Sequence, residues 1–142
     1  MQQWLIYALL SAAAASFVAI FGKIGMKDID STLATAVRSI IMTAFLVGLA
    51  IATGLTAHVR TLHARALTMI ALSGLAGATS WLFYFKAIQV GQVTRVAPID
   101  KLSMPLGIVL AVLILGERPN FINWVGIFLI SAGAYLATMP RT

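Results

Sequence analysis

Long apolar runs separated by short polar segments dominate this sequence, and the runs repeat at the length of a membrane helix. They predict helices at about residues 3–22, 31–54, 66–87, 94–115 and 121–139. At about 1.5 Å of rise per residue, such runs match a hydrocarbon core about 30 Å thick. Asp30 or Ser31 stands where an N-cap of the second helix is expected. The pattern predicts an all-α integral membrane protein with five transmembrane helices, forming a single domain over residues 1–142.

The fourth helix carries the most unusual chemistry. Its uncharged run, residues 102–115, is too short to cross a bilayer, so the helix must begin near Thr94 and include Asp100 and Lys101. Charges at membrane depth are costly and often functional, which favours a site that faces a substrate or ion. The alternative is a lysine that snorkels to the headgroups and pairs with Asp100. Pro105 lacks an N–H, which predicts a helix kink and a free carbonyl at Lys101.

Two further groups of residues are candidates for a binding site. Arg38 lies about two turns inside the second helix, and it either lines a cavity or snorkels to the interface. Trp81, Tyr84 and Phe85 share a face of the third helix beside Lys86. They form either the aromatic wall of a pocket or an aromatic belt at the membrane interface.

Composition excludes several classes of protein. With 61% hydrophobic and only 10% charged residues, the chain of 142 residues is too apolar for a soluble domain. The net charge of +6 is spread over helix ends and short loops, which argues against a nucleic-acid surface. The absence of cysteine excludes disulfides, iron–sulfur clusters and a thiol nucleophile. The N-terminus has no basic segment before its apolar run, so we expect a retained helix rather than a cleaved signal peptide.

The second loop concentrates basic residues and both histidines: His58, Arg60, His63 and Arg65. Histidines five apart do not share a helix face, and no cysteine or carboxylate stands nearby to complete a metal site. The serines at membrane depth have no evident base for nucleophilic catalysis. We therefore expect no metal, no cofactor and no enzymatic activity.

Small residues mark two helices for close packing. Gly74 and Gly77 lie in the third predicted helix, and Gly126 and Gly133 lie seven apart on one face of the fifth. Backbones approach closely where side chains are small, so these faces predict contacts between helices or between subunits.

Basic residues also bear on orientation, because positively charged loops tend to stay in the cytoplasm. The two sides carry Arg60, Arg65 and Arg118 against Lys23, Lys27, Lys86, Arg95 and Arg141. Three against five weakly favours a cytoplasmic C-terminal side. Counting Arg38 and Lys101 on that side gives three against seven and a firmer preference. The expected location is the cell (inner) membrane, as a multi-pass protein.

Several segments together resemble a known family. They are FGKIG, DSTLATAVR, SWLFYFKAIQVGQVTRVAPIDKLSMPL and LGERPNFINWVGIFLISAGAYL. The chain resembles the EamA family of the drug/metabolite transporter superfamily, and in particular its short members with one five-helix unit. The resemblance covers nearly the whole chain. Its most recognisable pattern is a proline in the fourth helix followed by Gly-Glu at its end, here Pro105, Gly116 and Glu117.

The resemblance implies a fold and an activity. Family members usually have ten helices in two inverted units, and they export or exchange small metabolites through a central cavity. A chain with one unit then implies a homodimer, with antiparallel subunits if the usual architecture is rebuilt. The related small multidrug pumps have an essential glutamate in their first helix. No acidic residue stands in the first helix here.

Two functions compete at this point. The first is a small-molecule transporter whose cavity is lined by Arg38, Lys101 and Lys86, with Asp100 as counter-ion or proton site. Three cations against one acid favour an anionic or zwitterionic solute. The second is a non-transporting membrane subunit or lipid-binding scaffold, whose basic residues hold anionic headgroups. Lipid bilayer and a second copy of the chain are the expected partners, and nucleic acid is not.

Overall fold

A computed structural model describes residues 2–139 of the chain. Arg141, one of the basic residues counted above, lies outside the described residues, as do Met1, Pro140 and Thr142. The side chains of His58 and Arg60 also lie outside the described part.

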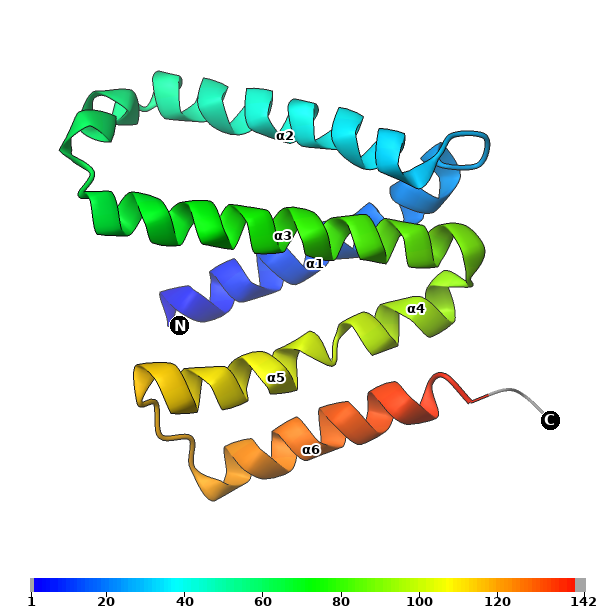
Figure 1. Cartoon of the computed structure of the whole chain (residues 1–142). Helices are drawn as coiled ribbons and strands as arrows, with labels where there is room; N and C mark the ends of the chain where they lie inside the picture. Colours follow the sequence, from blue (N-terminus) through cyan, green and yellow to red (C-terminus); the bar gives the residue numbers. More distant parts are fainter. Residues whose placement is uncertain (1, 140–142) are drawn as a thin grey trace. The chain divides into compact units, whose positions relative to one another are not determined.

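Helices make up the described chain, which contains no strand (Figure 1). They are α1 (Gln3–Gly25), α2 (Ser31–Ala52), the 3₁₀ helix η1 (Leu55–Thr61), α3 (Ala64–Val90), α4 (Val93–Asp100), α5 (Ser103–Leu110), the π-helical turn η2 (Ala111–Leu115) and α6 (Phe121–Leu136). The all-α class predicted from the sequence is confirmed. The predicted fourth helix is divided here into α4, α5 and η2.

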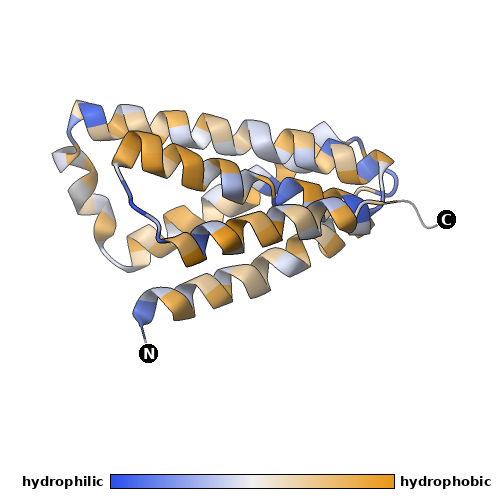
Figure 2. Ribbon diagram, turned by 90° about the horizontal axis from the view of Figure 1, so that it is seen from below, coloured by the Kyte–Doolittle hydropathy of each residue, from blue (hydrophilic) through white to orange (hydrophobic). Residues whose placement is uncertain are grey.

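Four helical segments have the length and apolar composition needed to cross a membrane: α1, α2, α3 and the run Val93–Leu115. The fifth, α6, is apolar but has 16 residues. Figure 2 shows the hydrophilic residues concentrated at helix ends and connections, with hydrophobic residues along the helices. Large apolar side chains remain exposed on every long helix, for example Phe45 of α2 and Leu75 of α3. Such a surface fits an apolar solvent, because the hydrocarbon core of a bilayer has no polar groups to offer.

The chain consists of two compact units. We call residues 21–89 the central unit, and residues 2–20 with 90–139 the terminal unit. The helix α1 contributes its last residues to the central unit and the rest to the terminal unit. Each unit is described by itself.

In the central unit, α2 and α3 run antiparallel and are connected through η1 (Figure 1). The end of α1 packs on the end of α3, where Phe85 and Ile88 are almost fully buried. Gly22 makes this approach possible. A Cβ added at Gly22 would stand 2.3 Å from Cε1 of Phe85, far inside van der Waals contact.

In the terminal unit, α6 packs against α4 and α5. The break between α4 and α5 falls at Lys101 and Leu102, four and three residues before Pro105 in sequence. Pro105 is the third residue of α5, in the first turn of that helix, where an N–H has no partner within the helix. The run then widens into η2 and ends at Gly116, whose φ of 71° is left-handed and favours glycine.

The expectation of a free carbonyl at Lys101 is wrong. The carbonyl oxygen of Lys101 accepts a hydrogen bond from the Met104 N–H at 3.0 Å, and the Ile99 carbonyl accepts from the Leu102 N–H at 3.0 Å. Both are bonds between residues three apart. The chain tightens into 3₁₀-type turns at the break, and this tightening supplies the partner that Pro105 cannot.

The glycine faces predicted to pack closely are open within their own units. Apart from its chain neighbours and the nearby backbone of its own helix, no described atom of the same unit lies within 4 Å of a Cβ added at Gly74, Gly77, Gly126 or Gly133.

We expect Gly22→Ala to destabilise the protein, because the new methyl group must displace the buried Phe85 ring. Overpacking of this kind costs about 1–3 kcal/mol. Thermal unfolding of the detergent-solubilised protein should show a lower midpoint. Gly25→Ala is the matched control, since a Cβ at Gly25 meets nothing within 4 Å. Equal midpoints for the two variants would contradict the close packing of α1 on α3.

Candidate functional site

Arg38 lies against an aromatic cluster in the central unit. Its guanidinium carbon is 3.6 Å from the centre of the Trp81 ring and 5.0 Å from that of Phe85. Trp81 and Phe85 stack with centroids 5.6 Å apart, and Tyr84 meets both rings edge to face, at 6.1 Å and 5.7 Å. A cation over an aromatic face is attracted by the ring quadrupole, by about 2 kcal/mol when the pair is shielded from water.

Arg38 has no carboxylate partner among the described residues. The ion pair found there joins Lys101 to Asp100, and no described group forms a hydrogen bond with the Arg38 guanidinium. The side chain is partly buried, yet none of its nitrogens is sealed from solvent. An arginine carries five N–H donors, so Arg38 has donors to offer to a molecule that enters from outside.

A group of hydrogen bonds ties three helix ends together next to this cluster. Lys23, at the end of α1, donates through Nζ to the carbonyls of Ile88 and Gln89, the latter at 3.2 Å. The Gln89 side chain donates through Nε2 to the Ile29 carbonyl at 2.9 Å, and its Oε1 accepts from the Ser31 N–H at 3.3 Å. We call these five residues the polar joint. A cation at the carbonyl end of a helix is favoured by the helix dipole.

Asp30 is the N-cap of α2, and it is one of the two residues predicted for that position. Its Oδ1 accepts hydrogen bonds from the backbone N–H groups of Thr32, at 2.8 Å, and Leu33, at 3.3 Å. These two bonds, aided by the positive charge of Lys86, hold the pKa of the Asp30 carboxyl below its usual value.

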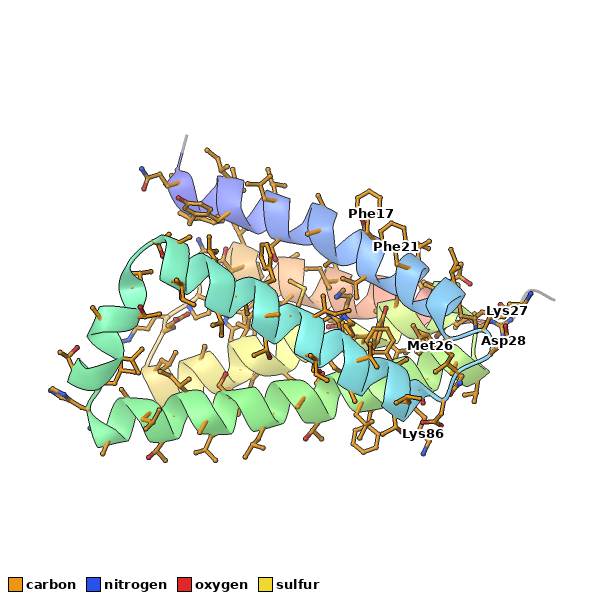
Figure 3. All side chains as sticks on the ribbon, turned by 90° about the horizontal axis from the view of Figure 1, so that it is seen from above. Phe17, Phe21, Met26, Lys27, Asp28 and Lys86 are labelled. Atoms are coloured by element: carbon orange, nitrogen blue, oxygen red, sulfur yellow. The ribbon has the colours of Figure 1, made fainter. Side chains whose placement is uncertain are left out.

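Lys86 belongs to the central unit but not to the aromatic cluster. Figure 3 shows it pointing outward from α3, near the end where the α1–α2 loop carries Lys27 and Asp28. Its side chain is exposed. Of the predicted site residues, the central unit brings together Arg38, Trp81 and Tyr84.

Asp100 and Lys101 lie in the terminal unit, at the break between α4 and α5. Lys101 Nζ is 3.3 Å from Asp100 Oδ2, and the lysine side chain is 57% exposed. Each charge therefore has its neighbour as counter-ion, unlike Arg38.

The chain matches the EamA-like transporter family over residues 2–139. It belongs to that family. A curated protein from Sinorhizobium sp., named "Uncharacterized transporter in cobO 3'region", is 42% identical over 135 residues, which cover 95% of this chain and 96% of that protein. No solved structure matches the chain.

Membership of the EamA-like transporter family makes this protein a multi-pass membrane transporter of small molecules. It agrees with the expectation that the chain is not an enzyme, since transport by this family is generally non-enzymatic.

Sequence reasoning missed the polar joint. The predicted helices end at residues 22 and 87, which leaves Lys23 and Gln89 in the connections, whereas α1 extends to Gly25 and α3 to Val90. A signal was present, because the pair Gly22–Lys23 stands at the end of an otherwise apolar helix and Gln89 is a polar residue directly after the apolar Ile88. A polar side chain at such a boundary commonly satisfies backbone groups of a neighbouring helix end.

We expect the contribution of Asp30 to stability to depend on pH. Because the folded-state pKa is lowered, the carboxylate stabilises the protein above the unfolded pKa, about 3.9, and this gain is lost as pH falls through the folded value. Thermal midpoints of wild type and Asp30→Ala should therefore differ most at neutral pH and converge below about pH 4. Asp28→Ala removes a loop carboxylate as the control. A gap that is the same at pH 7 and pH 3 would argue against this role.

Proposed function

We propose that this protein exports or exchanges small solutes that carry a carboxylate, anionic or zwitterionic, and that it works as an antiparallel homodimer. The observation that carries the proposal is the position of Arg38, stacked on Trp81 without a counter-ion among the described residues. The cluster also includes Tyr84, so a solute that reaches Arg38 meets an aromatic surface.

The stacking fixes how Arg38 can bind. The guanidinium carbon lies over the Trp81 ring, so the ring limits approach from that side, and the N–H donors have no hydrogen-bond partner among the described residues. A carboxylate has two oxygens at the spacing of two parallel N–H groups, which gives a bidentate and charge-assisted contact. An isolated charge at membrane depth is costly, and an incoming anion removes that cost.

The charged pair of the terminal unit has a different proposed role. Asp100 and Lys101 already neutralise each other, so they add little net charge to a binding site. We propose that Asp100 is a counter-ion or proton site for a coupling ion, and that Lys101 is a solute contact of the terminal unit. Lys86 is exposed and is assigned to the entrance of the cavity.

We expect flux in proteoliposomes that contain the purified chain alone. Radiolabelled aspartate, glutamate, alanine, glucose and choline form the test panel. Carboxylates should exchange, whereas the sugar and the cation should not. Arg38→Gln should reduce carboxylate flux about 10- to 100-fold, as expected for loss of hydrogen bonds to a charged group. Arg38→Lys should retain part of the flux, since an ammonium keeps the charge but not the fork.

Lys27→Gln is the control for that experiment, because it removes an exposed cation of the same unit. Normal flux in Arg38→Gln would exclude the assigned role of Arg38. Absence of all flux with correctly folded protein would favour the non-transporting subunit or lipid-binding scaffold instead.

The number of helices supports the proposed homodimer. One five-helix unit has odd parity, and two copies related by an axis in the membrane plane form an inverted repeat. The open faces at Gly77 and Gly126 are suited to the contact, because nothing of the same unit occupies them. The uneven distribution of basic residues opposes equal insertion in both directions, so orientation is the decisive test.

The chain has no cysteine, which allows a direct measurement of orientation. We expect Lys27→Cys, in intact cells, to react with a membrane-impermeant maleimide in about half of the molecules, because an antiparallel dimer places Lys27 of its two copies on opposite sides. Permeabilised cells should give complete labelling. Labelling of all or none of the molecules in intact cells would exclude the antiparallel dimer.

A further inference from the structure

Two helix faces meet in the central unit, and each carries both a binding residue and part of the polar joint. On α2, Ser31, Thr35 and Arg38 lie at positions i, i+4 and i+7, which share one face. Ser31 and Thr35 are buried, at 2% and 8% exposure. The face that α2 buries at the joint is therefore the face that presents Arg38.

The same arrangement recurs on α3. Trp81, Phe85 and Ile88 lie at i, i+4 and i+7, followed by Gln89. Phe85 and Ile88 are 2% and 0% exposed. The stack of Arg38 on Trp81 and the hydrogen bonds of Gln89 thus belong to one interface between α2 and α3.

We propose that Gln89 and Lys23 are positioning residues that hold Arg38 against Trp81. Gln89 binds the backbone of Ile29 and Ser31 on either side of the α2 N-terminus, so it fixes where α2 begins and which face it turns to α3. Lys23 fixes the end of α1 to the same end of α3 through two carbonyls. The importance of this positioning for transport rests on the proposed function of Arg38.

Geometry makes the stack sensitive to the joint. Arg38 follows Ser31 by seven residues, roughly 10 Å along α2. A tilt of α2 by about 10° at the joint would move the base of Arg38 by roughly 2 Å. A cation interacts with a ring within about 6 Å of its centroid. The guanidinium carbon now lies 3.6 Å from the ring centre, so a displacement of roughly 2 Å would bring it close to that limit.

The test measures the stack directly and needs no transported solute. Trp4→Phe and Trp124→Phe leave Trp81 as the sole tryptophan, since the sequence contains three. Acrylamide quenching of Trp81 fluorescence then reports how well its face is covered. Arg38→Gln should raise the quenching constant about twofold, because one of the two ring faces loses its cover.

Gln89→Leu should raise the quenching constant by the same factor, and Gln89→Leu combined with Arg38→Gln should add nothing further, because both changes act on one contact. Gln92→Leu is the matched control. Gln92 is exposed, it precedes α4, and its side chain makes no capping hydrogen bond. It should leave quenching unchanged.

Two further variants cover the possibility that Gln89→Leu fails to fold. Gln89→Glu keeps the shape and the oxygen that accepts from Ser31 but loses the N–H that binds Ile29. Lys23→Met removes the other half of the joint, with Lys27→Met as its control. Each variant of the joint should raise Trp81 quenching in the folded protein.

Unchanged quenching in folded Gln89→Leu, or in Gln89→Glu where the leucine variant does not fold, would overturn the proposal. So would quenching that rises additively in the double variant, since the joint would then act on Trp81 independently of Arg38. A lower thermal midpoint with unchanged quenching would mean a merely structural role and would also overturn it. If Gln89→Leu raises quenching while Arg38→Gln leaves carboxylate flux unchanged, the positioning stands and the proposed function fails.

Discussion

The central unit depends on the satisfaction of backbone groups at helix ends. A helix leaves its last carbonyls without partners, and in a bilayer no water replaces them cheaply. Here Lys23 supplies donors to the carbonyls of Ile88 and Gln89, while the Gln89 amide serves the backbone around the start of α2. Three helix ends are joined by these few bonds. The buried Phe85 and Ile88 lie directly beside them, so packing and hydrogen bonding reinforce each other at one place.

The helices could be predicted from the sequence because apolar runs of membrane length carry a strong signal. The beginning of α2 could also be predicted, since Asp30 is a favourable N-cap residue. The break at Lys101 was harder. Pro105 indicated an irregular helix in that region. The position of the break, however, is set by local 3₁₀-type hydrogen bonds. These bonds depend on backbone geometry, which residue types alone do not determine.

Site residues divide in the same way. An arginine inside an apolar run is conspicuous, as are Trp81 and Tyr84 on one face of a helix, and the structure brings these three together. The contribution of Gln89 was not visible, because its partners are backbone groups some 60 residues away in sequence. Every residue has a backbone carbonyl, and all except proline have a backbone N–H, so residue type alone cannot identify which of these groups Gln89 binds. Asp100 and Lys101, adjacent in sequence, form the ion pair that their proximity suggested.

In the proposed antiparallel dimer, the neutrality of the Gln89 amide has a consequence. The two sides of an energised membrane differ in pH, and the joints of two antiparallel copies would face opposite compartments. A carboxyl group at this position would bind a proton to an extent set by the pH on its own side, so the two halves of the dimer would differ wherever its pKa lies near those pH values. An amide has no such proton to exchange. In such a dimer, both copies would therefore keep the same Gln89 hydrogen bonds to Ile29 and Ser31, although the pH differs between the two sides of the membrane.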